Sequence, residues 1–252
     1  MQSILVDDAQ GVRTITFNRP EVRNAIDSTL STEVSEAIDE AEQLDDIHAI
    51  VVTGAGRAFC AGMDLNAFAR GERPSIPGRG LCGITRHEPR LPLLAAVEGA
   101  AVGGGFEIAL TADLLIAATD ARFALPEVRR GLVATQGGAL RLGRRLPHPI
   151  AAEMLLTGRM YTAADLAGTG LFTRLVEPGQ ALSTAQELGR LISTMAPLAL
   201  RATLEVLRQQ NTPSPDMWAH QDTWFSPVLN STDAREGATA FVEHRRPRWQ
   251  GR

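Results

Sequence analysis

Short apolar runs that alternate with helical or polar segments constrain the fold of this chain more than any other feature of its sequence. Three of these runs have the length and composition of buried strands: His48–Thr53, Leu93–Val97 and Leu114–Ala117. A segment of helical periodicity or a short polar crossover separates each from the next. Because strands that alternate with helices are typical of sheets covered by helices, the pattern indicates an α/β fold.

The two ends of the chain extend this pattern in different ways. Ser3–Val6 and Val12–Phe17 are predicted strands joined by a turn at Asp7–Gly11, and Ser28–Leu44 carries apolar residues at helical spacing. After about residue 135 the strands nearly stop. The helices predicted there are Ala139–Leu146, Ile150–Leu156, Ala181–Thr194, Pro197–Gln209 and Asp233–Glu243, and Leu171–Val176 is the last predicted strand.

Two local signals complete the predicted outline. The final helix has Asp233 in the position of an N-cap, with Glu236 three residues further on. The segment Arg70–Arg90 is rich in Gly, Pro and Arg and has no apolar period, so we expect a mobile loop.

Composition excludes several classes of protein. The chain has 252 residues, of which 44% are hydrophobic and 21% charged, which is an ordinary globular balance and not that of a disordered chain. Its net charge of −4 disfavours a nucleic-acid or anionic-membrane partner. All 25 basic residues are Arg, so Schiff-base chemistry on lysine and a P-loop lysine are both excluded.

Cysteine usage and the N-terminus point to a reducing compartment. Cys60 and Cys82 are 22 residues apart and lack metal-ligand spacing, so we expect reduced thiols, no disulfide and no zinc site. The first residues show no basic region followed by an apolar run, and no stretch of 18 apolar residues occurs. We therefore expect a cytoplasmic protein without a metal ion and without a membrane or nucleic-acid partner.

Two glycine-rich segments follow predicted strands and offer free backbone amides. In Ala58–Leu65, Asp64 is placed to cap a short helix, which leaves the amide of Met63 free. In Glu98–Leu110, the triplet Gly103–Gly105 opens an apolar helix, and three consecutive glycines indicate that something requires the absence of side chains. The alternative for the first segment is an ordinary strand-to-helix turn.

Two carboxylates lie in or near these segments. Glu107 falls in the first turn after the glycine triplet, and Glu127 follows Pro126 after the next predicted strand. Each has a simpler explanation, because acids are favoured near helix N-termini and Pro-Glu commonly opens a helix. Taken together, two amides from separate loops can hold a carbonyl oxygen as it becomes an oxyanion, while two carboxylates move protons or activate water. A thioester suits such a pocket.

At these residues the sequence resembles the crotonase (enoyl-CoA hydratase/isomerase) superfamily. The resemblance covers almost the whole chain, and its motifs occur in the family's order. They are Pro20-Glu21-Val22-Arg23-Asn24-Ala25, Ala61-Gly62-Met63-Asp64-Leu65, Glu98-Gly99 through Gly103-Gly104-Gly105-Phe106-Glu107, Phe123 to Glu127, Ala151 to Gly158, and Glu236-Gly237 through Arg245 to Trp249. The segment Ala124–Thr157 is closer to the carnitinyl-CoA dehydratase-like branch than to the mitochondrial hydratase.

The resemblance implies a spiral of ββα units in which residues 1–195 bind acyl-CoA, and a helical C-terminal region at 196–252 that builds homotrimers or homohexamers. It implies no separate cofactor, because coenzyme A is part of the substrate. The implied oxyanion hole is formed by the amides of Met63 and Gly104, and the implied catalytic acids are Glu107 and Glu127. The residues implied in substrate and CoA binding are Arg23, Ala25, Ala61, Gly62, Asp64, Leu65, Gly103 and Thr135.

Membership of this superfamily does not fix the reaction, but the two glutamates favour one. Hydratases of the family have both acids at the 20-residue spacing seen between Glu107 and Glu127, whereas isomerases generally keep only the second. The leading hypothesis is therefore addition of water to an α,β-unsaturated acyl-CoA, or its reverse. The alternatives are an isomerase or another crotonase-type enzyme acting on a specialised acyl-CoA, and a non-catalytic acyl-CoA binder.

Two positions depart from the family pattern, and one segment extends it. Thr135 replaces a glycine whose amide lies near the catalytic water in hydratases, and His244 replaces a common lysine near the C-terminus. Arginines in Arg70–Arg90 offer contacts to a charged acyl end or to CoA, with a solvated loop as the alternative.

Overall fold

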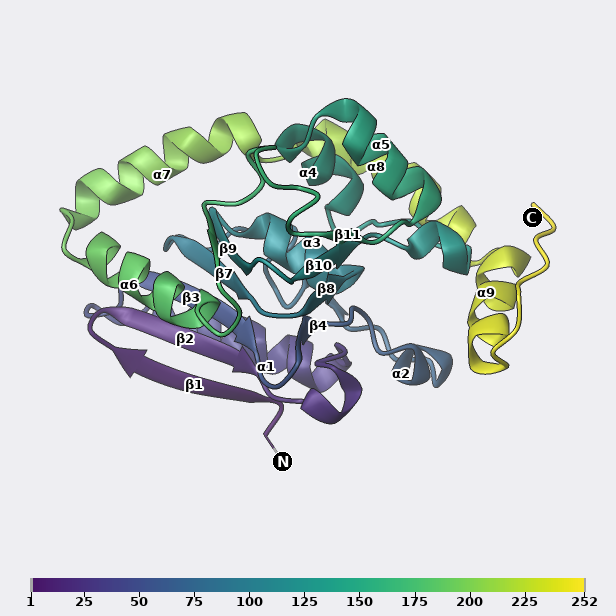
Figure 1. Ribbon diagram of the computed structural model, residues 1–252, viewed down its shortest axis with the longest axis horizontal. Helices are drawn as coiled ribbons and strands as arrows, with labels where there is room; N and C mark the ends of the chain where they lie inside the picture. Colours follow the sequence, from purple (N-terminus) through teal and green to yellow (C-terminus); the bar gives the residue numbers. More distant parts are fainter. Residues whose placement is uncertain (1, 252) are drawn as a thin grey trace.

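Two largely parallel sheets form the frame of the molecule (Figure 1). The computed structural model describes residues 2–251, apart from the side chains at positions 210 and 211. The larger sheet contains, in spatial order, β1 (Ile4–Ala9), β2 (Val12–Phe17), β3 (Ala49–Gly54), β7 (Leu93–Val97), β9 (Leu114–Ala118) and β12 (Arg174–Val176). Only the β1–β2 pair is antiparallel. The strands predicted from the apolar runs are all confirmed, with shifts of a few residues at their ends.

The smaller sheet repeats the order of the larger one. It contains β11 (Tyr161–Thr162), β10 (Arg122–Ala124), β8 (Ala100–Val102) and β4 (Ala58–Cys60). Strands β3, β7 and β9 of the larger sheet lead into β4, β8 and β10, and these in turn lead into α2 (Leu65–Ala69), α3 (Gly104–Thr111) and the 3-10 helix η2 (Glu127–Arg130). The chain therefore winds through successive ββα units, which confirms the predicted α/β spiral.

Helices cover the larger sheet, and the alternation of side chains along its strands explains how. In β3, Ala49 and Val51 pack in a cluster with Ala185 of α6 (Ala181–Ser193), while Ile50 and Val52 belong to the main core. Glu98 accepts hydrogen bonds from the amides of Gly179 and Ala181 and so caps α6 from a distance. The remaining helices of the spiral are η1 (Pro20–Val22), α1 (Ser28–Ala41), α4 (Gly138–Arg145) and α5 (His148–Thr157).

The C-terminal part is helical, as predicted, but differs in two details. It contains α7 (Pro197–Asn211), α8 (Pro215–Leu229) and α9 (Thr232–Val242), of which α8 was not predicted. The N-cap of α9 is Ser231, whose hydroxyl accepts from the amide of Ala234, so the predicted Asp233 cap is wrong. The Asp233 carboxylate instead accepts from the backbone amide of Gly251 at 2.9 Å, which fastens the chain end to this helix.

The segment Arg70–Arg90 has more structure than its composition predicts. It contains a hairpin of β5 (Ser75–Ile76) and β6 (Gly80–Leu81), followed by residues whose side chains are buried in the main core, including Cys82 and Ile84. The expectation of a loop is wrong for this part. Gly78 lies in the turn of the hairpin, and the apolar residues Leu81, Cys82 and Ile84 pack in the main core. Cys60 and Cys82 are both buried and form no disulfide, as predicted.

The backbone at Gly105 packs closely against Cys60, and a substitution at this position tests that contact. A Cβ at Gly105 would lie 2.4 Å from the carbonyl oxygen of Cys60 and 2.7 Å from its Cβ. We predict that Gly105→Ala lowers the free energy of unfolding by about 1–3 kcal/mol, measured by urea denaturation at fixed protein concentration. Gly143→Ala is the matched control, because a Cβ at that helical position meets nothing within 4 Å. Equal stability of the two variants would contradict the proposed tight contact.

Candidate active site

Three loops meet where β4, β8 and β10 end. Since these strands are parallel neighbours, their carboxyl ends lie along one edge of the smaller sheet. Met63 follows β4, Gly104 follows β8 and Glu127 follows β10, so each loop brings one sequence-predicted site residue to this edge. The carboxyl ends of parallel strands are a common place for ligand sites in α/β proteins.

The first loop presents a free amide because its helix is capped by a side chain. Asp64 Oδ1 accepts from the amides of Asn66 at 3.0 Å and Ala67 at 3.1 Å, which confirms the predicted cap of α2. The amide of Met63, just before this cap, donates to no acceptor within residues 2–251. A helix start of this kind leaves a donor directed at whatever approaches it.

The second loop brings another free amide beside the first. Gly104 is the first residue of α3, and within the described chain its amide donates to no acceptor. A Cβ on Gly104 would lie 3.7 Å from the Met63 nitrogen, and one on Gly62 would lie 3.2 Å from the Gly104 nitrogen. At Gly62 only glycine fits, because φ is +89° and a Cβ would also lie 2.7 Å from the carbonyl oxygen of Val102, so the two amides are neighbours across a narrow gap.

Glu107 is buried one turn into α3, and two amides hold it. Its Oε1 accepts from the backbone amides of Gln136 at 2.7 Å and Gly138 at 2.8 Å. Burial raises the pKa of Glu107 to about 7, against the opposing effect of these two amides and of the nearby arginines Arg141 and Arg86. A carboxyl group with its pKa near neutrality can exchange protons at physiological pH.

Glu127 lies beside Glu107 and is held less firmly. Its Oε2 is buried and has no hydrogen-bond partner in the described chain, while its Oε1 faces Gly103, where a Cβ would lie only 3.1 Å away. Burial, and then repulsion by Glu107, raises the pKa of Glu127 to about 8. The structure therefore brings together the two acids that the sequence singled out, in environments that differ.

The residues expected at the CoA end lie next to this edge. The amide of Ala61 donates to the carbonyl of Arg23 at 2.9 Å, so the segment containing Ala25 lies against the first loop. The Arg23 side chain is exposed, whereas Asp64 is buried and Leu65 is half-buried. Both oxygens of Asp64 already have partners, because Oδ2 pairs with Arg19 at 3.2 Å.

The loop that holds Glu107 is supported by α8, which the sequence analysis missed. Thr135 is buried, and its carbonyl accepts from the side-chain amide of Gln221 at 2.8 Å. Trp218 of the same helix lies near Gly137, where a Cβ would be 3.1 Å from its ring. Ser214 followed by Pro215 was a readable start signal for this helix. The internal Pro227 concealed it.

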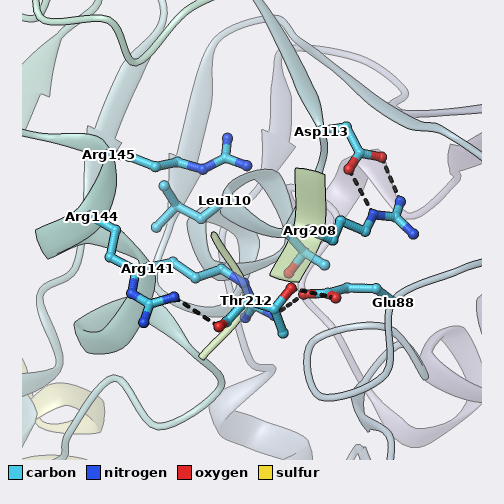
Figure 2. Close-up of a pocket in the computed structure, with 9 residues that line it drawn as sticks. Glu88, Leu110, Asp113, Arg141, Arg144, Arg145, Arg208 and Thr212 are labelled. Atoms are coloured by element: carbon cyan, nitrogen blue, oxygen red, sulfur yellow. Dashed lines mark hydrogen bonds and ion pairs between the residues drawn. The ribbon is translucent and has the colours of Figure 1, made fainter. Parts of the chain in front are cut away.

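A cavity of about 30 Å³ lies beneath α4 and is lined by arginines (Figure 2). Its carboxylates are already paired: Asp113 binds Arg208 at 2.6 Å, and Glu88 binds Arg141 at 3.2 Å. Glu107 and Glu127 do not line it. We interpret these pairs as connections between α4, α7 and the core, with Arg141 extending their positive charge toward Glu107.

No group of three or more metal-ligating side chains occurs among residues 2–251. None of the helices described is long and apolar enough to span a bilayer.

The chain is similar to known proteins over nearly its whole length. The family model described as enoyl-CoA hydratase/isomerase matches residues 7–252. The chain is a member of the enoyl-CoA hydratase/isomerase family. It is 39% identical to the carnitinyl-CoA dehydratase of Proteus mirabilis, over 100% of this chain and 99% of the relative. It is 36% identical to the mevalonyl-coenzyme A hydratase of Aspergillus fumigatus, over 94% and 90% of the two chains.

Solved structures of family members share the fold. The carnitinyl-CoA hydratase of Mycobacterium avium superposes with a TM-score of 0.94 at 39% identity, and both chains are covered completely. An enoyl-CoA hydratase of Mycobacterium tuberculosis superposes with a TM-score of 0.81 at 46% identity, again over both complete chains. The ββα spiral described above is therefore the fold of this enoyl-CoA hydratase/isomerase family.

The buried acids predict a characteristic pH dependence of stability. An unfolded carboxyl group titrates near its ordinary pKa of 4.5, whereas the folded values of Glu107 and Glu127 are raised. Between the unfolded and folded pKa values the native state binds more protons, so the free energy of unfolding falls as the pH rises. We predict that the double variant Glu107→Gln/Glu127→Gln gains stability over the unsubstituted protein by more than about 1 kcal/mol between about pH 5 and about pH 8.

Urea denaturation across this pH range measures that difference. The exposed pair Glu153 and Arg159 provides the control, because Glu153→Gln removes a carboxylate that carries no burial cost. Parallel stability profiles for the double variant and the unsubstituted protein would show that the two acids titrate normally.

Proposed function

We propose that this protein adds water to the double bond of an α,β-unsaturated acyl-CoA thioester, or catalyses the reverse dehydration. One observation carries the proposal: the buried Glu107 and the half-buried Glu127, both with raised pKa values, lie at the same strand edge as two neighbouring free amides. The family membership supports it, and so do relatives described as a CoA-thioester dehydratase and a CoA-thioester hydratase.

The amides of Met63 and Gly104 form the proposed oxyanion hole. Each is a donor without an acceptor in the described chain, and the absence of side chains at Gly62 and Gly104 gives a thioester oxygen access to both. Hydration places negative charge on this oxygen as the enolate forms, and fixed donors stabilise that charge without reorganising.

The two acids then divide the proton transfers by their environments. Glu107 accepts two amide hydrogen bonds and lies near two arginines, which favour its charged form. Glu127 has only a hydrogen bond from its own backbone amide, its Oε2 has no partner in the described chain, and Glu107 repels it, which favours its neutral form. In the proposed hydration, Glu107 takes a proton from the water that attacks Cβ, and Glu127 gives a proton to Cα. The amide of Thr135 is the third proposed contact of the water.

Coenzyme A is the part of the substrate that we propose the protein binds away from the reacting atoms, and no separate cofactor enters the proposed reaction. The proposed CoA and thioester contacts come from residues that lie next to the strand edge. They are Arg23, Ala25, Ala61, Leu65 and the loop glycines Gly62 and Gly103. For Asp64 we propose an indirect contribution through the cap of α2, since both of its oxygens are occupied.

We also propose that copies of the chain assemble into trimers or hexamers in the cytoplasm. Large apolar side chains on α7 support the assembly, since Leu198 is 80% and Val206 is 60% exposed in a single copy. Exposed apolar surface of this kind marks interaction sites more often than free surface.

Kinetics of single-site variants test the proposed hydratase. We predict that Glu107→Gln and Glu127→Gln each lower kcat for crotonyl-CoA hydration by roughly 10²–10⁴-fold, because each removes a general acid–base group. The assay is the loss of enoyl-thioester absorbance, and the exposed Glu153→Gln variant is the control.

The outcomes separate the alternatives. Full activity in the Glu107→Gln variant would point to an isomerase-type reaction that needs only the second acid. Binding of crotonyl-CoA by calorimetry without any turnover would indicate a specialised acyl group or a non-catalytic binder.

A further inference from the structure

Gln136 occupies a position in the site that the proton transfers do not use. Its backbone amide donates to Glu107, so its Cα lies next to the reacting carboxylates. Its side chain is half-buried and extends to the hairpin β5–β6, where it meets Leu81 and Thr85.

The orientation of the Gln136 carboxamide is fixed by its partners. The backbone amide of Leu81 donates to Oε1 at 3.1 Å, and the Thr85 hydroxyl donates to the same oxygen at 3.1 Å. A backbone N–H can only donate, so the atom that it meets must be the carbonyl oxygen of the carboxamide. The other end of the group is therefore the NH₂, which is a donor only.

The surrounding chain is shaped around this arrangement. Gly80 has a φ of +77°, and a Cβ there would lie 2.2 Å from the Thr85 hydroxyl oxygen and 3.0 Å from Gln136 Oε1. The Thr85 hydroxyl in turn accepts from the Leu81 amide at 2.8 Å. The carboxamide is thus held by a small closed network and not by a single contact.

This network lies near the proposed thioester site. The Leu81 side chain lies 3.4 Å from the position of a Cβ on Gly104, whose amide belongs to the proposed oxyanion hole. Gln136 therefore reaches from Glu107, which its backbone amide binds, to Leu81, which its carboxamide oxygen binds. Within the described chain its Nε2 has no acceptor, and it is not among the buried atoms that lack a partner, so it remains accessible.

We propose that Gln136 is a specificity-determining residue, and that its Nε2 donates a hydrogen bond to an oxygen carried by the acyl chain beyond the double bond. This inference rests on the proposed function and names its substrate class: an enoyl-CoA with a carbonyl, hydroxyl or carboxylate oxygen on the acyl group. A plain alkyl chain leaves this donor without an acceptor once water is displaced, which costs binding.

The test compares substrates as a ratio. The probes are 2-hexenoyl-CoA and a set of analogues of equal length that carry an oxo group, an acceptor only, at each saturated carbon in turn. We expect the unsubstituted protein to prefer at least one oxo analogue by roughly 10–100-fold in kcat/KM. This is the range for one hydrogen bond whose loss leaves a donor without an acceptor once the substrate covers it.

Two variants of Gln136 separate the role of its NH₂ donor from the role of its oxygen, which binds Leu81 and Thr85. Gln136→Glu keeps an oxygen for Leu81 and Thr85 but removes the NH₂ donor, and Gln136→Met removes both. We expect the preference for the oxo analogue to fall to within about threefold of unity in both variants. Any loss common to both substrates cancels in the ratio. The exposed Gln43→Glu is the control for the added charge and leaves the ratio unchanged.

Two results would overturn the inference: no preference for any oxo analogue in the unsubstituted protein, or a preference that survives in both Gln136 variants. Absence of all hydration would overturn the proposed function alone. Calorimetric Kd values for hexanoyl-CoA and its oxo analogues would then decide the inference, with the same ratios and the same variants.

Discussion

The contact between the loop after β4 and the first turn of α3 is the constraint on which the site depends. At Gly105 the backbone of α3 packs directly on Cys60, and at Gly62 the two loops approach so closely that no side chain fits. This approach brings the amides of Met63 and Gly104 together. It also fixes where α3 begins, and hence where Glu107 points. The three consecutive glycines cost backbone entropy, which the packing of the apolar α3 against the core offsets.

A second constraint follows from the first, because α3 carries an acid into the core. A buried carboxylate is costly unless hydrogen bonds compensate it, and the amides of Gln136 and Gly138 supply that compensation for Glu107. Glu127 Oε2 receives none from the described chain. The two environments are therefore unequal, and on this inequality rests our proposal of Glu127 as the acid and Glu107 as the base. Helix α8 supports Glu107 indirectly. Its Gln221 holds the carbonyl of Thr135, which lies in the loop whose amides bind Glu107.

Local patterns predicted most of this arrangement. The buried strands and the Asp64 cap rest on residues whose chemistry is set by near neighbours in the chain, so they were readable, and the pairing of Glu107 with Glu127 followed from the family resemblance. The support that α8 gives the Glu107 loop and the Thr85–Gln136 network were not readable, because they depend on contacts between segments 51 or more residues apart. The error at Asp233 has a related cause: Ser231 competes for the same cap, and the Asp233 side chain serves the chain end.

The stereochemistry of hydration in deuterated water tests the central claim most directly. If the two adjacent carboxylates hold one water on one face of the substrate, its oxygen and one deuteron add to the same face of the double bond. We predict a 3-hydroxyacyl-CoA from crotonyl-CoA with a single deuterium at Cα in the syn position, resolved by NMR. Anti addition, or deuterium exchange without a hydroxylated product, would contradict the account of Glu107 and Glu127 acting on a shared water.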